Sequence, residues 1–270
     1  MLRWRSAYGI IEKGNPRLIW GISMNQKILA AGIAAALSIA SISSMAATVS
    51  LNTAGTGAKT NRPIALPSAA ASTVTITEST DSSTITTNNS VSCNNGVGHA
   101  DNSYYRAFQL STFPALNQGA FRVDSVTFGV ETASSTGGTQ PATVNLYSSS
   151  STTPTLASLT LLTTTAVTIP DGSASTLTVN FTTPPALTVA TDTLVVELFT
   201  PNGEAVSNLF FIGSNAAGQS APGYIKASDC GINDITDLST VGFGSMDIVM
   251  TVTGNTQATT PVRLQDFKVD

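Results

Sequence analysis

Two cysteines, and the polar residues near them, are the first candidates for chemistry in this sequence. Cys93 and Cys230 are the only cysteines among the 270 residues. In an oxidising compartment an isolated pair in one domain is expected to form a disulfide, and the long loop predicts about 4–5 kcal/mol of stabilisation in the chain-entropy model. Such a bridge would draw together two loops with oxygen-bearing side chains, namely Asp101, Asn102, Asp229, Asp234 and Asp237.

These five side chains form a candidate calcium site. Ca²⁺ takes about six to eight oxygen ligands, including loop carbonyls, and it would offset the repulsion between the four carboxylates. No EF-hand loop is present. The alternative is that the Asp and Asn side chains make Asx-turns and caps. The sequence therefore predicts no cofactor, with calcium at these five residues as the one candidate.

The sequence contains few residues that could form a catalytic site. His99 is the single histidine and no nucleophile-elbow motif accompanies it, so neither a Ser-His-Asp triad nor a zinc site is expected. Glu131 and Glu197 lie on expected strands and are candidates for a hydrolytic carboxylate pair. Arg106 and Arg122 are available to pair with them instead. We therefore predict that the chain is not an enzyme, with a hydrolase that uses an unrecognised carboxylate pair as an alternative.

Tyrosines are the candidates for contact with a ligand: Tyr104, Tyr105, Tyr147 and Tyr224. Sugar sites commonly present flat aromatic faces, and both tryptophans precede residue 24. Tyr104 and Tyr105 point to opposite faces if both lie in a strand, so at least one of them could be exposed. The alternative for each tyrosine is packing in the core or at its rim.

Short strands must position these side chains. Residues 73–77 alternate polar and apolar, which predicts a half-buried strand, with 83–86 as a candidate hairpin partner. Both faces of residues 121–131 look apolar, so we expect a β-bulge near Asp124 and Ser125. Residues 194–199 form a continuous apolar run that suits a central strand. Further strands are expected at 104–110, 143–147, 156–162, 167–169, 177–181, 208–212 and 247–252.

About ten short strands separated by turn signals indicate an all-β fold. A jelly-roll-like antiparallel β-sandwich is the first choice, and an immunoglobulin-like sandwich is the runner-up. We place the domain at residues 73–254.

The N-terminal region predicts export. Residues 24–47 read as a signal peptide with a positive start, an apolar stretch and cleavage after Ala46 or Ala47. A membrane anchor is the alternative, but a spanning helix needs about 20 apolar residues. Residues 1–23 read as a mis-called upstream start or an extended n-region, and 48–72 as a flexible Thr/Ala/Pro tether. Residues 255–270 form a tail that could be an edge strand, a sorting peptide or a donor strand.

Charge narrows the choice of partner. The net charge is −4 for the whole chain, and the residues after Ala47 hold 7 basic and 15 acidic side chains, a net of −8. Nucleic acid is therefore not expected as a partner. Cleavage of the signal peptide would also leave no membrane span in the mature chain.

Four segments resemble an uncharacterised β-sandwich accessory domain of secreted bacterial multidomain proteins. They are residues 101–108, 125–131, 208–215 and 229–234, and the resemblance covers about two-thirds of the precursor. It implies export and fold, and it carries no catalytic residue to this chain.

The sequence thus predicts a secreted, non-catalytic surface or extracellular module for adhesion, matrix or assembly contacts. A carbohydrate-binding module is the alternative. Its expected partners are extracellular polysaccharide or a surface protein, and the tails offer a route to self-assembly.

Overall fold

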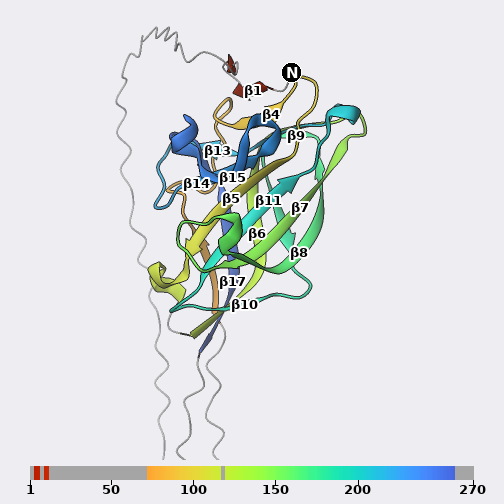
Figure 1. The fold of residues 1–270 in the computed structure, drawn as a ribbon. Helices are drawn as coiled ribbons and strands as arrows, with labels where there is room; N and C mark the ends of the chain where they lie inside the picture. The colour runs from red at the N-terminus through yellow and green to blue at the C-terminus, as the bar shows by residue number, and fades with distance from the viewer. Residues whose placement is uncertain (1–2, 7–8, 12–71, 117–118, 259–270) are drawn as a thin grey trace, which may run out of the picture. The chain divides into compact units, whose positions relative to one another are not determined.

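Alternating Thr and Val residues, with few helix-forming runs, build a chain of strands in the computed structural model of this protein. The structure describes residues 3–6, 9–11, 72–116 and 119–258. Two six-stranded antiparallel sheets form the domain, and Figure 1 shows β5, β11, β7 and β8 side by side within one of them.

The first sheet has the strand order β15-β14-β5-β11-β7-β8. Its strands are β5 (Asn102–Gln109), β7 (Thr139–Ser149), β8 (Leu159–Pro170), β11 (Thr193–Thr200), β14 (Gly223–Ala227) and β15 (Ile232–Asp237). The expected central strand is β11, which pairs with β5 on one side and β7 on the other.

The second sheet has the order β10-β6-β17-β3, and β9 and β12 also pair with the long strand β6. Its strands are β3 (Ser72–Thr77), β6 (Gly119–Ser134), β9 (Gly172–Asn180), β10 (Ala186–Thr188), β12 (Leu209–Ile212) and β17 (Met250–Ala258).

Smaller elements complete the described chain. β1 (Arg3–Ser6) pairs with β2 (Gly9–Ile11) and with β4 (Val91–Asn94), and β13 (Ser214–Asn215) pairs with β16 (Asp247–Ile248). The 3₁₀ turns are η1 (Leu110–Thr112), η2 (Pro114–Leu116), η3 (Leu156–Ser158), η4 (Glu204–Val206), η5 (Ser228–Cys230) and η6 (Leu238–Val241). No helix in the described ranges is long and apolar enough to cross a membrane.

The two sheets enclose one main core. Phe108 and Leu146 of the first sheet and Phe128 and Val252 of the second are fully buried in the same cluster. Because both sheets contribute to it, the all-β antiparallel sandwich predicted from the sequence is confirmed.

The predicted β-bulge is confirmed at Asp124. In the β6–β17 ladder, Thr253 pairs with Ser125 but the next residue, Gly254, pairs with Val123. Asp124 is therefore the extra residue on β6. The bulge turns Phe121 and Val123 to the core face that Val126 and Phe128 occupy further along the strand.

Two expectations about strands are wrong. Residues 83–86 are not a strand, and β3 pairs with β17 instead. An Asx-turn explains the difference, since Asp81 Oδ1 accepts hydrogen bonds from the backbone N–H groups of Ser83 and Thr84. The separate strands expected at 156–162 and 167–169 are one strand, β8, preceded by η3.

Several predicted segments lie outside the described residues: the signal peptide 24–47, residues 48–71 of the predicted tether 48–72, and the tail from residue 259. Ser72, the last residue of the predicted tether, is the first residue of β3. Strand β17 continues to Ala258 and so includes the first four residues of the predicted tail.

Candidate functional site

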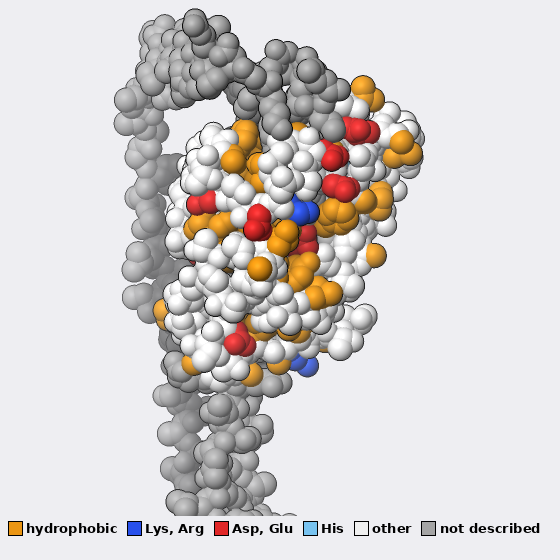
Figure 2. All heavy atoms as spheres, in the orientation of Figure 1, with side chains coloured by type: hydrophobic (Ala, Val, Ile, Leu, Met, Phe, Trp, Pro, Cys, Tyr) orange, Lys and Arg blue, Asp and Glu red, His pale blue; other side chains and the backbone are white. Residues whose placement is uncertain are grey.

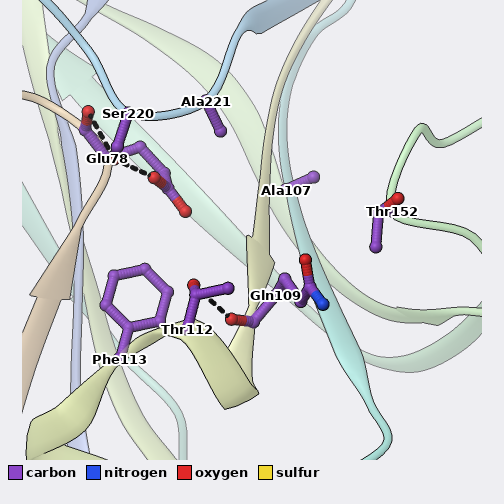
Figure 3. Close-up of a pocket in the computed structure, with 8 residues that line it drawn as sticks. All are labelled: Glu78, Ala107, Gln109, Thr112, Phe113, Thr152, Ser220 and Ala221. Atoms are coloured by element: carbon purple, nitrogen blue, oxygen red, sulfur yellow. Dashed lines mark hydrogen bonds between the residues drawn. The ribbon is translucent and has the colours of Figure 1, made fainter.

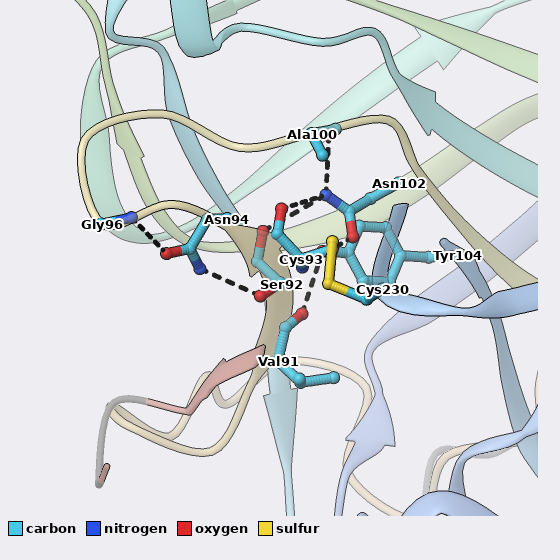
Figure 4. The surroundings of a disulfide bond; sticks show 9 residues. All are labelled: Val91, Ser92, Cys93, Asn94, Gly96, Ala100, Asn102, Tyr104 and Cys230. Atoms are coloured by element: carbon cyan, nitrogen blue, oxygen red, sulfur yellow. Dashed lines mark hydrogen bonds between the residues drawn. A yellow bond between two sulfur atoms is a disulfide. The ribbon is translucent and has the colours of Figure 1, made fainter. Parts of the chain in front are cut away.

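The predicted disulfide is present. Cys93 of β4 bonds Cys230 of η5, with an S–S distance of 2.03 Å and a Cα–Cα distance of 5.9 Å. Asn102 lies beside it, fully buried (Figure 4). Its Oδ1 accepts from Cys93 N at 2.9 Å, and its Nδ2 donates to Cys93 O at 3.1 Å and to Ala100 O at 2.9 Å. Both polar atoms of this amide are therefore used to join β4 to β5.

The five predicted calcium ligands are not gathered into one group. No cluster of three or more His, Cys, Asp or Glu side chains suited to a metal occurs within the described ranges. Asp101 accepts from Asn202 N at 2.6 Å, Asp234 from Leu156 N at 2.8 Å, and Asp237 caps η6 through Ser239 N at 2.8 Å. Asp229 is exposed. Three of the four carboxylates thus accept from loop or turn N–H groups, as in the alternative of turns and caps.

Three of the four predicted tyrosines come together on one face of the first sheet. Tyr105, Tyr147 and Tyr224 lie in a second hydrophobic cluster, apart from the main core. Tyr104 points the other way, where it is fully buried in the main core and donates to Val91 O at 2.9 Å. We call the face that carries the second cluster the outer face of the first sheet.

A carboxylate lies at the centre of this outer face. Glu197, which is 6% exposed, accepts from Tyr105 Oη at 2.8 Å, from Tyr147 Oη at 2.7 Å and from Asn145 Nδ2 at 2.8 Å. Burial raises the pKa of Tyr105 and Tyr147 above the usual tyrosine range, and the neighbouring Glu197 acts in the same direction. Both phenols therefore stay protonated as donors.

The pairing registers place one residue from each of the six strands in a single row across this face. The row reads Asp237, Tyr224, Tyr105, Glu197, Asn145 and Thr164. The β7–β8 loop, which includes η3, folds over the row, because Leu156 N reaches Asp234 of β15 at the far end of the sheet (Figure 1). Tyr105 and Tyr224 are therefore 2% and 3% exposed, and Tyr147 is half-buried.

The other candidate groups have separate partners. Glu131 accepts from Asn88 N at 2.9 Å and Asn89 N at 3.2 Å, and neither it nor Glu197 pairs with Arg106 or Arg122. Arg122 instead contacts Asp124 at 3.1 Å. His99 is 1% exposed, with Nε2 3.0 Å from Pro201 O, and burial lowers its pKa.

A pocket of about 290 Å³ adjoins the tyrosine cluster, and Ala107 belongs to both. Figure 3 shows Ala107 and Gln109 on β5, with Thr152 on a separate strand-connecting loop. Half of its lining residues are polar and uncharged, and the rest are two alanines, one aromatic ring and one carboxylate. The lining residues are Glu78, Ala107, Gln109, Thr112, Phe113, Thr152, Ser220 and Ala221.

Arg106 fixes one wall of this pocket from behind. It follows Tyr105 on β5, points inward and is fully buried. Its Nη1 donates to Gln219 Oε1 and to Ala221 O, both at 2.7 Å, while Nη2 donates to Ser79 Oγ at 3.1 Å. Burial lowers the pKa of Arg106 to about 10, so it remains charged at neutral pH. The residues next to these acceptors, Glu78 and Ser220, line the pocket and hydrogen-bond each other.

The sequence did not point to the pocket residues. Gln109, Thr152 and Ser220 come from three separate segments, and none belongs to a motif. The one local signal is Phe113-Pro114, since a proline after an expected strand indicates a turn.

Comparisons with known proteins do not assign this chain to a family. No family model and no curated protein matches the chain. A solved structure that matches contains the cysteine protease and lectin-like domains of a surface layer associated protein of Clostridium difficile. The identity is 13% and the TM-score is 0.34, and the match covers 62% of this chain but only 38% of that one.

One expectation is corrected by this comparison. The sequence predicts that the chain is not an enzyme, whereas the matching structure includes a cysteine protease domain. The description of the chain as non-catalytic is therefore withdrawn.

Proposed function

We propose that this chain is an extracellular or surface module that makes adhesive contacts by binding neutral polysaccharide in the pocket beside β5. The observation that carries the proposal is the lining of that pocket. Gln109, Thr112 and Thr152 offer amide and hydroxyl groups, and Phe113 offers a ring. The resemblance to accessory domains of secreted bacterial proteins fits the same role.

The pocket chemistry matches a sugar ring. Binding sites commonly combine apolar or aromatic walls with a few polar groups that fix orientation. Phe113 could pack against the apolar face of a ring, while Gln109 and Thr152 hydrogen-bond its hydroxyl groups. At about 290 Å³ the pocket is at the lower end of ligand sites, so one ring or a chain end is the expected occupant.

Charge supports a neutral sugar rather than an anionic one. Residues 72–258 contain thirteen acidic and three basic side chains, and Glu78 lines the pocket itself. Figure 2 shows acidic side chains spread over the visible face, with only isolated Lys or Arg side chains among them. An anionic polysaccharide would meet like charge both at long range and in the pocket.

Affinity electrophoresis and titration calorimetry against neutral and anionic polysaccharides test the proposal. We expect a neutral polysaccharide to bind, and Gln109→Ala or Thr152→Ala to weaken binding about 3–10-fold, the value of one neutral hydrogen bond. Thr176→Ala is the matched control, because Thr176 is an exposed threonine on β9 of the other sheet. Equal binding by the pocket variants and the wild type would place the sugar site elsewhere.

A further inference from the structure

One side of the sandwich carries almost no charge. From residue 132 to residue 191 the single charged residue is Asp171, and this segment forms β7, β8, β9 and β10. Asp171 lies at the β8–β9 turn and accepts from Ser135 N and Ser135 Oγ at 3.0 and 2.8 Å. The remaining described surface is strongly acidic, so two copies of this chain repel each other least on the neutral side.

The same side presents strand edges without a partner. Within the described strands, β8 pairs only with β7, and β9 pairs only with β6. The unpaired N–H and C=O groups of such an edge are a template for another strand. Natural edges are commonly blunted by charges, by proline or by bulges. In β8 the bulge comes early, at Leu162, because Leu161 pairs with Tyr147 while Thr163 pairs with Leu146.

Between that bulge and Pro170, the last residue of β8, the edge is unprotected. Residues 163–169 read Thr-Thr-Thr-Ala-Val-Thr-Ile, with no charge, glycine or proline. Seven uncharged residues of high β-propensity are the sequence type that pairs readily with another strand.

Exposed leucines lie beside this edge. Only five large hydrophobic side chains are exposed in the described part of the chain, and two of them belong to β8. Leu161 and Leu162 at the start of β8 are 55% and 36% exposed. Apolar side chains gathered at one unpaired edge indicate a surface that is covered by a partner.

We propose that β8 is a self-association edge, at which a second copy of this chain adds its own β8 in antiparallel pairing about a two-fold axis near Ala166. A two-fold axis makes the surface pair with itself, so the partner's edge must also be neutral, and β8 meets that requirement. The pairing would join the first sheets of two copies into one continuous sheet.

The inference goes beyond polysaccharide binding but is compatible with it. Two strands, β11 and β7, separate β8 from β5, which lines the pocket. The paired molecule would therefore keep two pockets on one sheet, and a long polysaccharide could engage both with increased avidity.

Sedimentation equilibrium of the purified, oxidised chain over a range of concentrations tests this pairing. We expect a monomer–dimer equilibrium, and Ala166→Lys should raise the dimer Kd by more than about tenfold, since the two-fold axis brings two like charges together. Thr75→Lys is the matched control, because Thr75 is an exposed residue of β3, an edge strand of the other sheet. It should leave the Kd unchanged.

A charge-swap experiment distinguishes loss of pairing by charge repulsion from a folding defect in the Ala166→Lys variant. Ala166→Glu should also be monomeric, whereas a mixture of the Lys and Glu variants should dimerise again. A wild-type chain that stays monomeric up to millimolar concentration would overturn the proposal. So would a dimer that Ala166→Lys leaves intact, or one lost only when residues 259–270 are deleted, which would assign assembly to the tail. Polysaccharide binding by a strictly monomeric chain would overturn the pairing and leave the proposed function standing.

Discussion

Buried polar side chains in this protein connect segments that are distant in sequence. Arg106 donates to carbonyl or side-chain oxygen atoms of Ile248, Gln219, Ala221 and Ser79, and so joins β5 to three other segments. Burying a charge costs free energy, and hydrogen bonds offset this cost only if their acceptors are held in the right positions. A buried arginine therefore favours one defined arrangement of the chain around it. At Arg106 that arrangement includes the pocket wall at Ala221.

His99 differs from Arg106 because its hydrogen bonding is incomplete. Within the described residues its Nδ1 has no hydrogen-bond partner, and burial lowers its pKa. A group whose folded pKa is depressed contributes stability that is fully present above its ordinary pKa of about 6.5 and is lost as the pH falls toward the folded value. We expect the free energy of unfolding to decrease between pH 7 and pH 5, measured by denaturant titration.

The control for His99 is His99→Gln, which keeps a polar side chain but cannot titrate. Its stability should fall less steeply over the same pH window, because only the carboxylates still contribute. Parallel pH profiles for the variant and the wild type would show that His99 does not supply this dependence.

Among the elements, the bulged strand β6 depends on a glycine in its partner β17. A Cβ at Gly254 would lie 2.1 Å from the carbonyl oxygen of Arg122 and 2.8 Å from the ring of Phe121. The close approach follows from the extra residue Asp124, which brings the two backbones together.

We therefore expect Gly254→Ala to destabilise the protein by about 3 kcal/mol or more, because backbone atoms must move to admit the methyl group. Thermal and urea unfolding measure the change. Gly137→Ala is the control, since a Cβ there meets nothing within 4 Å, and it should change stability by less than about 0.5 kcal/mol. A Gly254→Ala protein as stable as the control would contradict the close contact at the bulge.

The sequence was informative where a strand has one buried face. Alternation located β3, and the doubly apolar pattern of β6 located the bulge. Strands β4 and β14 were not predicted because they are only four and five residues long, too short for a pattern of burial to be recognised in the sequence. The pocket was not predicted from the sequence for a different reason. Gln109 and Thr152 meet only through strand register and loop folding, which no local pattern encodes.

At the scale of the whole molecule, the disulfide joins parts that the sheets do not. Strand β4 belongs to neither large sheet, whereas η5 connects β14 to β15 at the edge of the first sheet. Cys93 and Cys230 are both buried, and the bridge spans 137 residues. It therefore restricts most of the domain in the unfolded state.

Replacing both cysteines by alanine tests how far the domain depends on this bridge. The chain-entropy model gives an upper value of about 5 kcal/mol for a loop of this length, and measured losses are commonly about 2–5 kcal/mol. We expect Cys93→Ala/Cys230→Ala to lower the Tm by roughly 10 °C in calorimetry. Dithiothreitol should lower the Tm of the wild type by a similar amount and leave the double variant unchanged. If the variant and the oxidised wild type melt together, the two sheets hold the domain without help from the bridge, and the stabilisation assigned to the long loop is wrong.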